Sequence, residues 1–255
     1  MVVSGAVVRR VVDAEAVARA TADEIVDAAS RALEERGSFT LALAGGSTPR
    51  RLYELLADPG APYRGRLRWD QIHVFFGDER HVPPDHPDSN YRMAREALLA
   101  RVPVASVHRM HGEVADAAAA ADSYQLELER FFGVAAADGL PPRLDLVLLG
   151  LGPDGHTASL FPGSAALDER RRWVVAPFVE RLKAHRITLT LPVLDRSREV
   201  LFLVSGADKA AAMAQVFAPE PGSTPPPAAR VRPETGGPLW IVDRAAAARL
   251  PPHRA

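Results

Sequence analysis

The strongest constraint on the fold is the segment LDLVLLGLGPDGHTASLFPGS, residues 144–164. It opens with an apolar run, residues 144–149, in which Asp145 is the one polar residue, and Gly150 closes the run. Such a run predicts a strand that is buried on both faces, as in the middle of a parallel sheet. The glycine-rich turn that follows delivers Asp154 and His156. Because ligands of open α/β sheets bind beyond the carboxyl ends of the strands, we expect this turn to form the functional site.

Predicted strands and helices alternate along the rest of the chain. This alternation predicts an α/β fold with a mainly parallel sheet and helices on both faces. We find no internal repeat and no long linker, so we expect residues 1–255 to form one domain. The predicted strands are 7–12 (at an edge), 39–44, 72–76, 144–149, 173–176, 186–191, 199–204 and 239–242; the predicted helices are 13–36, 49–57 with Pro49 at its first position, 89–101, 113–132 and 209–217; and 219–233 is predicted to be a Pro-rich surface loop.

The composition argues against several classes of protein. A net charge of -1 gives no reason to expect nucleic acid or an anionic membrane as a partner. The absence of cysteine excludes a disulfide framework and thiolate metal sites, and it agrees with a cytoplasmic protein. No apolar stretch has the length of a membrane span, and the first residues lack the apolar core of a signal peptide. We expect no metal, because the histidines fit no compact ligand set: His81, His86, His108 and His111.

The sequence AGGSTP, residues 44–49, follows a predicted strand and opens a helix. Its glycines, Gly45 and Gly46, allow close approach of a ligand, and the helix start offers unpaired N–H groups at the positive end of the helix dipole. Ser47 and Thr48 add hydroxyl donors. These features suit a phosphate group, although the Lys-Ser/Thr ending of a Walker loop is missing. An ordinary capped helix start explains the serine and the threonine equally well, so both interpretations remain open.

The turn at 150–156 combines a dinucleotide-like glycine pattern with an acid–base pair. Its glycines match G-x-G-x-x-G literally, but a dinucleotide site usually opens the first βαβ unit and has an acidic residue at the end of the next strand. Neither condition holds here, so we do not expect NAD. His156 can accept a proton at neutral pH, and Asp154 can orient the ring and stabilise its charged form. The alternative for His156 is an ordinary surface histidine.

Charged residues also stand at the ends of other predicted strands. GDER, residues 77–80, places Asp78 and Arg80 just past a strand. Arg80 could contact an anionic substrate or a developing oxyanion, and the alternative is a salt-bridged loop. Lys209 follows the strand at 199–204, and Arg186 opens the strand at 186–191. Each could contact a phosphate group or remain solvated.

Five segments together resemble one known family. In chain order they are LALAGGSTPRRLYELLA, IHVFFGDERHVPPDHPDSNYRMA, LDLVLLGLGPDGHTASLFPGS, RITLTLPVL and LVSGADKAAAM. Their combination, from about residue 39 to residue 243, resembles the 6-phosphogluconolactonases of the glucosamine-6-phosphate isomerase/6-phosphogluconolactonase family. The resemblance implies a three-layer αβα Rossmann-like fold similar to glucosamine-6-phosphate deaminase and ribose-5-phosphate isomerase. It also implies a lactonase of the oxidative pentose phosphate pathway that uses no metal or other cofactor.

The resemblance also implies the roles of particular residues. It makes His156 the base that takes a proton from water, Asp154 the residue that orients it, and Arg80 or backbone N–H groups the stabiliser of the oxyanion. The run FVERLKAHRITLT is less typical and leaves open whether Lys183, His185 or only Arg186 faces the ligand. The implied substrate-binding residues are Gly45, Gly46, Ser47, Thr48, Asp78, Asn90, Gly155, Arg186 and Lys209.

Two other functions compete with lactone hydrolysis. Deaminase relatives share the phosphate loop and a G-x-G-x-D-G-H turn, but they resemble IAFNEP where this chain has TASLFP and DEY where it has DER. The acid–base set for aldose–ketose isomerisation is therefore incomplete. A sugar-phosphate sensor would need a DNA-binding helix-turn-helix, for which the short segment before residue 39 leaves no room. We expect a small sugar-phosphate lactone as substrate, no nucleic-acid or membrane partner, and a monomer or weak homo-oligomer.

Overall fold

The apolar run at 144–149 forms β6 (Leu146–Leu149), the middle strand of a seven-stranded sheet. The computed structural model describes residues 5–220 and 222–251. The other strands of this sheet are β1 (Val7–Val11), β2 (Phe39–Leu43), β3 (Ile72–Phe76), β5 (Ser106–Val107), β10 (Glu199–Val204) and β11 (Leu239–Asp243). Their order is β1-β11-β10-β6-β2-β3-β5, and each neighbouring pair is parallel. The predicted parallel sheet is confirmed, with β1 at an edge as expected.

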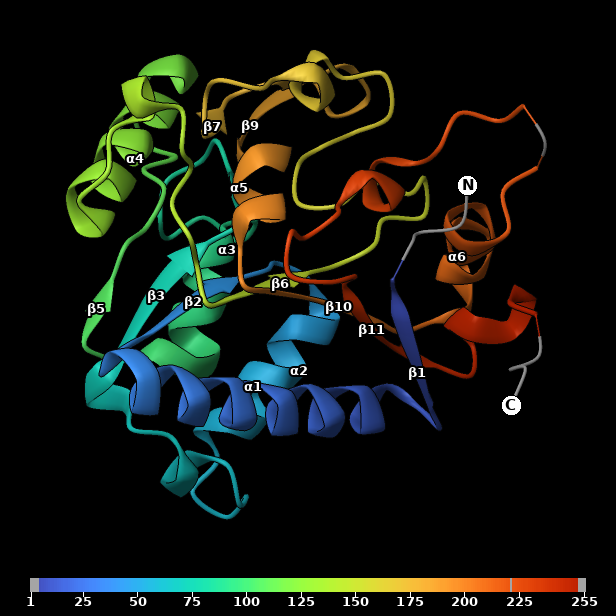
Figure 1. The fold of residues 1–255 in the computed structure, drawn as a ribbon, viewed down its shortest axis with the longest axis horizontal. Coiled ribbons are helices and arrows are strands. Elements are labelled where there is room, and N and C mark those ends of the chain that lie inside the picture. The colour runs from blue at the N-terminus through green and yellow to red at the C-terminus, as the bar shows by residue number, and fades with distance from the viewer. Residues whose placement is uncertain (1–4, 221, 252–255) are drawn as a thin grey trace.

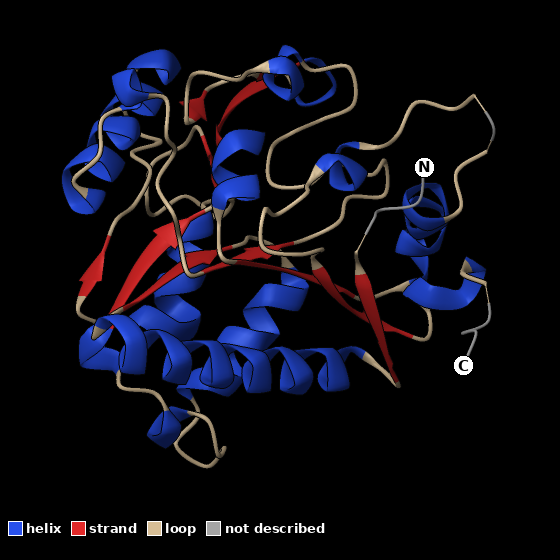
Figure 2. Ribbon diagram, viewed as in Figure 1, coloured by secondary structure: helices blue, strands red, loops and turns tan. Residues whose placement is uncertain are grey.

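Helices cover both faces of this sheet (Figure 1, Figure 2). The helix bounds are α1 (Ala14–Arg36), α2 (Ser47–Ala57), α3 (Asn90–Ala94, which continues as a π-helical turn at Arg95–Leu99), α4 (Ala117–Phe132), α5 (Leu191–Arg196) and α6 (Ala210–Phe217). In Figure 1, α1 and α2 lie on one face, and α4 and α5 lie on the other. The three-layer αβα arrangement is therefore confirmed.

The ends of α1 and α2 show which sequence signals predicted a helix boundary correctly. Asp13 caps α1, because its side chain accepts the Ala16 N–H at 2.9 Å, and Gly37 ends the helix in the left-handed conformation at φ 73°. Both were expected. The prediction that Pro49 opens α2 is wrong, because Gly46 is the residue before the helix and Ser47 begins it. The free N–H groups of this helix start therefore lie closer to Gly46 than the sequence indicated.

The strands are buried on both faces because the sheet separates two apolar cores. Along β6, Leu146 and Leu148 pack into the core beneath α1 and α2, whereas Val147 and Leu149 pack into the core beneath α4 and α5. This alternation follows from the period of two in a strand. A central strand with a core on each side must be apolar throughout, which is why its sequence shows an unbroken run.

A second, smaller sheet lies beyond the carboxyl end of β3. It contains β4 (Asp78–Arg80), β7 (Val174–Val175), β8 (Phe178–Val179) and β9 (Ala184–Leu189), all paired antiparallel with β9. Gly77 joins the two sheets, because its N–H donates to the Leu43 carbonyl at 2.9 Å and its own carbonyl accepts the Leu189 N–H at 2.9 Å. The strands predicted at 173–176 and 186–191 thus lie outside the parallel sheet, and GDER is a strand rather than a loop.

The segment predicted as a Pro-rich surface loop, 219–233, is partly buried. Ala228 and Val231 are fully buried, and the stretch Pro227–Arg230 forms a short 3-10 helix. The Ala228 N–H donates to the Gly155 carbonyl at 3.0 Å, so the segment packs against the turn that follows β6. Among the described residues, no helix is both long and apolar enough to cross a membrane.

Candidate active site

The carboxyl ends of β2, β3 and β6 meet the small sheet around a cavity of about 370 Å³. A cavity of this size lies within the range of small-molecule sites. It forms where ligands of open α/β sheets are expected to bind. Its walls come from Ala44, Gly45, Gly46, Gly77, Asp78, Arg80, Leu148, Leu149, Gly150, Leu151, Gly152, Pro153, His156, Thr157, Ala158, Ser159, Phe161, Arg181, Leu182, Arg186 and Lys209.

The turn after β6 is closed by its own backbone and threonine side chain. The Gly152 N–H donates to the His156 carbonyl at 2.8 Å, and the Thr157 hydroxyl donates to the Gly150 carbonyl at 2.8 Å. A Cβ at position 152 would overlap the His156 ring, so this position requires glycine. Ala158, which ends the turn in the cavity wall, has a φ of 47°, a strained conformation for alanine.

Asp154 and His156 form a hydrogen-bonded pair in this turn. Nδ1 of His156 lies 2.5 Å from Oδ1 of Asp154, and the same oxygen accepts the His156 backbone N–H at 3.2 Å. An ionised carboxylate can only accept, so Nδ1 carries the proton and Nε2 is the nitrogen available to a ligand. Burial alone would raise the pKa of Asp154, but the hydrogen bond and charge of His156 and the charge of Arg181 outweigh burial and lower it.

Arg181 is a site residue that sequence reasoning missed. It lies on a short 3-10 turn, Glu180–Leu182, between β8 and β9, and its Nη2 lies 3.1 Å from Oδ2 of Asp154. The one signal in the sequence was the unusual basic run before RITLT. The other two residues that the sequence left open, Lys183 and His185, do not line the cavity. Lys183 pairs with Glu180 in solvent, and His185 contacts the Ala176 carbonyl and the ring of Phe178.

Three of the predicted basic residues do line the cavity. Arg80 and Arg186 are direct partners in the antiparallel pair β4–β9, and Lys209 reaches the cavity from the short 3-10 turn before α6. Like charges opposite each other destabilise a strand pair, so this arrangement favours binding of an anion between them. Burial and the charge of Arg80 lower the pKa of Arg186, which is the expected sign of crowded positive charge.

The predicted phosphate loop lies only partly in the cavity wall. Gly45 and Gly46 line the cavity, whereas Ser47 and Thr48 occupy the first turn of α2 outside it. Asn90 also lies outside the wall and is 3% exposed. Its side chain donates to the Asp78 carbonyl at 2.9 Å and fills the space that a Cβ on Gly45 would need. We therefore assign Asn90 to supporting the loop from behind.

The other predicted residues have mixed positions. Asp78 lines the cavity, but it is 8% exposed, and its Oδ2 accepts the Ser159 hydroxyl at 2.6 Å. Gly155, with a φ of 80°, lies outside the wall, and a Cβ there would overlap Pro226. Its left-handed conformation and this close approach explain the glycine without a ligand. Both residues hold the turn in place.

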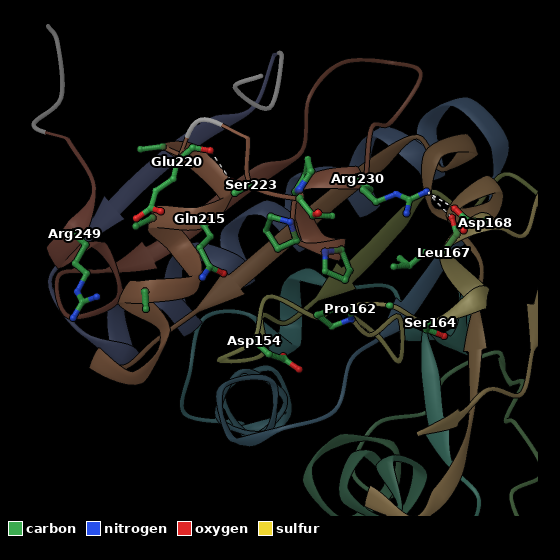
Figure 3. Close-up of a pocket in the computed structure, with 18 of the residues that line it drawn as sticks. Asp154, Pro162, Ser164, Leu167, Asp168, Gln215, Glu220, Ser223, Arg230 and Arg249 are labelled. Atoms are coloured by element: carbon green, nitrogen blue, oxygen red, sulfur yellow. Dashed lines mark hydrogen bonds and ion pairs between the residues drawn. The ribbon is translucent and has the colours of Figure 1, made fainter. Parts of the chain in front are cut away.

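Asp154 borders a second cavity, of about 840 Å³ (Figure 3). The walls of this larger cavity come mainly from residues 162–168, from α6 and from the Pro-rich segment. Arg230 in its wall pairs with Asp168 at 3.1 Å. Asp154 lines this second cavity and not the basic one, and its two carboxylate oxygens contact His156 and Arg181, which do line the basic cavity. Among the described residues, no group of three or more His, Cys, Asp or Glu side chains is placed to hold a metal ion.

An αβα fold with a carboxylate-bound histidine in the wall of a basic cavity defines a protein suited to small anionic ligands. The sequence model described as glucosamine-6-phosphate isomerases/6-phosphogluconolactonase matches residues 12–240. The chain belongs to this family.

Several proteins of known name or structure are similar to this chain. The 6-phosphogluconolactonase of Synechocystis is 46% identical over 225 residues, which are 88% of this chain and 89% of that protein. The 6-phosphogluconolactonase of Mycobacterium tuberculosis is 39% identical over 244 residues, which are 94% and 96% of the two chains. The solved structure of 6-phosphogluconolactonase from Trypanosoma cruzi has a TM-score of 0.83 and 32% identity, and it covers 98% of each chain. A monomeric glucosamine-6-phosphate deaminase, with a TM-score of 0.74 and 20% identity, shares the fold.

Proposed function

We propose that this protein hydrolyses 6-phospho-D-glucono-1,5-lactone to 6-phospho-D-gluconate, a step of the oxidative pentose phosphate pathway. One observation carries the proposal: the His156 ring and three basic side chains, Arg80, Arg186 and Lys209, line the same cavity. A histidine base and an anion site in one small cavity are what a phosphorylated lactone requires. The names of the relatives agree with this substrate.

The substrate is oriented by its phosphate group. We assign the phosphate to Arg186, Lys209 and the backbone N–H groups of Gly45 and Gly46, which places the lactone carbonyl toward His156. Nε2 of His156 takes a proton from water as the water oxygen attacks C1. Arg80 or backbone N–H groups stabilise the negative charge that develops on the carbonyl oxygen.

The intermediate then collapses and the ring opens. The C1–O bond to the ring oxygen breaks, and that oxygen receives the proton held by Nε2, while the new carboxylic acid releases a proton to solvent. Asp154 keeps the proton on Nδ1 and stabilises the charged imidazolium between these steps. A positioned base of this kind contributes about 10²- to 10⁴-fold to the rate.

The chemistry of an aldose–ketose isomerase fits the cavity less well. Isomerisation needs additional acid–base groups beside the ring-opening histidine. Among the described residues that line the cavity, Asp78 is the one with a carboxylate, and it is engaged by Ser159 and Asn90. The residues after the histidine are Thr157 and Ala158, which supply no acid. We therefore favour hydrolysis over isomerisation.

A coupled assay tests the proposed reaction. Glucose-6-phosphate dehydrogenase generates fresh lactone, and acid release is followed with and without the protein. We expect acceleration over spontaneous hydrolysis, no deamination of glucosamine-6-phosphate, and no loss of rate after dialysis against EDTA. A rate no higher than that of spontaneous hydrolysis would contradict the proposal.

The His156→Ala variant tests the assigned base. We expect the rate to fall by about 10²-fold or more, because the general base is removed. The fold should be retained, since the side chain is 23% exposed and its removal opens no space in either core. His111→Ala is the control, since His111 is an exposed histidine outside the cavity. Near-normal hydrolysis by His156→Ala would remove this residue from the mechanism.

We also propose that the reaction takes place in the cytoplasm, as the cysteine-free sequence suggests, and that the enzyme is a monomer or weak homo-oligomer. Sedimentation of the purified protein at several concentrations measures the oligomeric state.

A further inference from the structure

We propose that Arg181 is a positioning residue for the proposed lactone hydrolysis, which holds the Asp154–His156 pair so that Nε2 of His156 faces the basic cavity. This inference rests on the proposed function. It assigns a role to a side chain that sequence reasoning passed over.

The first argument concerns the second oxygen of Asp154. Oδ1 is occupied by the ring and the backbone N–H of His156, at 2.5 Å and 3.2 Å. Oδ2 is held by Nη2 of Arg181, at 3.1 Å. Asp154 itself lines the larger cavity and not the basic one (Figure 3). Without the guanidinium, the carboxylate could rotate toward that space, and the imidazole would lose the group that fixes its orientation.

The second argument concerns the ring of Phe161, which contacts both His156 and Arg181. The imidazole of His156 lies against this ring with the centroids 4.3 Å apart, and the guanidinium carbon of Arg181 lies 4.9 Å from the same centroid. A cation over an aromatic face is attracted by the ring. The shared ring therefore fixes Arg181 and His156 side by side, with Nη2 of Arg181 3.4 Å from Nδ1 of His156.

The third argument excludes a mainly structural role. The side chain of Arg181 is 49% exposed and that of Asp154 is 29% exposed. Ion pairs of such exposure add little to stability. Arg181 also lies at the tip of a short connection between β8 and β9, outside both apolar cores. Its replacement should leave the fold intact, so any effect on turnover reports on the pair.

The test compares Arg181→Gln with Arg181→Lys and with Lys183→Gln. Lys183→Gln is the matched control. It removes a positive charge two residues from Arg181, and the Lys183 side chain is 78% exposed and lies outside the cavity. For Arg181→Gln we expect kcat to fall about tenfold, a part of the 10²- to 10⁴-fold due to a positioned base, with KM within about twofold. Arg181→Lys should recover part of the loss, and Lys183→Gln should behave as the unmodified protein.

A double-mutant cycle shows whether Arg181 acts through Asp154. In an Asp154→Asn background, Arg181→Gln should lower kcat by less than about twofold, because residues of one unit are not additive. Additive effects would overturn the proposal. A raised KM with unchanged kcat would also overturn it, because Arg181 would then be a substrate contact.

An NMR measurement gives a readout that needs no turnover. The ring-nitrogen resonances of His156, assigned with His156→Ala, report which nitrogen carries the proton in the unmodified protein and the variants. Without the guanidinium the carboxylate no longer fixes the proton on Nδ1, so these resonances should move toward a mixture of tautomers in Arg181→Gln and stay in place in Lys183→Gln. Unmoved resonances in Arg181→Gln overturn the proposal. Failure of the proposed function would appear separately, as an absence of lactone hydrolysis by the unmodified protein.

Discussion

Single glycines make room for the functional side chains. Gly152 leaves space for the ring of His156, and Gly45 leaves space for the side chain of Asn90. Neither glycine is needed for a left-handed backbone, since neither has a positive φ. Each is required because another residue occupies the position of its missing Cβ. At the scale of the residue, the site therefore depends on the missing side chains of these two glycines as well as on its charged groups.

Gly152→Ala tests this requirement. The added methyl group would overlap the imidazole, so the ring must turn and kcat should fall by about 10²-fold, the cost of a small misplacement of a catalytic group. Gly65→Ala is the control, because a Cβ there meets nothing within 4 Å and the residue lies outside the cavity. Lactone hydrolysis and the circular dichroism spectrum are measured for both variants. Normal turnover by Gly152→Ala would show that the ring position is not critical.

At the scale of the element, the sequence was most informative about the parallel strands. Strands such as β6 and β10 are buried on both faces, so their apolar runs are visible without a structure. β4 and β8 have three and two residues, which is too short for a period to appear. Both strands pair with β9, and this pairing follows from the topology of the whole chain and not from a local pattern.

The same distinction separates the site residues that could be predicted from those that could not. Asp154 and His156 follow a recognisable strand within one turn, so their proximity is local. Arg80 and Arg186 are 106 positions apart, and only the pairing of β4 with β9 makes them neighbours. Arg181 reaches the cavity because the chain turns at Glu180–Leu182, and no apolar pattern or glycine marks that turn.

Helix α5 contains a pH-dependent carboxyl group, Asp195, which contacts the segment before β11. Oδ1 of Asp195 accepts the Arg232 N–H at 2.6 Å. Burial raises the pKa of Asp195 from its ordinary 3.8 to about 6. The folded protein therefore binds this proton more tightly than the unfolded chain. The resulting stabilisation is full below about pH 3.8 and is lost as the pH rises through about 6.

Asp195→Asn tests this linkage. Asparagine is always neutral and can still accept the Arg232 N–H. Between pH 4.5 and 7.5, the free energy of unfolding of the variant should increase relative to the unmodified protein by on the order of 1 kcal/mol, after allowance for partial exposure to solvent. Urea unfolding at both pH values measures the difference. The exposed Asp138, changed to Asn, is the control. A difference that stays constant with pH would contradict the assignment.

At the scale of the whole molecule, the cavity lies where two sheets with different strand directions meet. The parallel sheet supplies Gly45, Gly46 and the turn after β6, whereas the antiparallel sheet supplies Arg80 and Arg186. A ligand that spans the cavity therefore connects both sheets. Because such a ligand binds the folded state and not the unfolded chain, it stabilises the protein by mass action.

Thermal unfolding with the proposed product tests this coupling. We expect 6-phosphogluconate to raise the Tm, with about 2.7 kcal/mol of stabilisation at 100 times its Kd. Gluconate lacks the phosphate group and should have a much smaller effect. Arg186→Gln should reduce the shift caused by 6-phosphogluconate. Equal shifts with gluconate and 6-phosphogluconate would show that the basic side chains do not recognise the phosphate.

The walls of the cavity come from stretches that begin near residue 44 and end at residue 209. No half of the polypeptide contains them all. A proteolytic fragment that lacks either end of this range, or a chain that has formed only its first strands and helices, would therefore be inert toward substrate. During refolding, catalytic competence should return last, after the sheet has closed around β6 and the tip that carries Arg181 has docked.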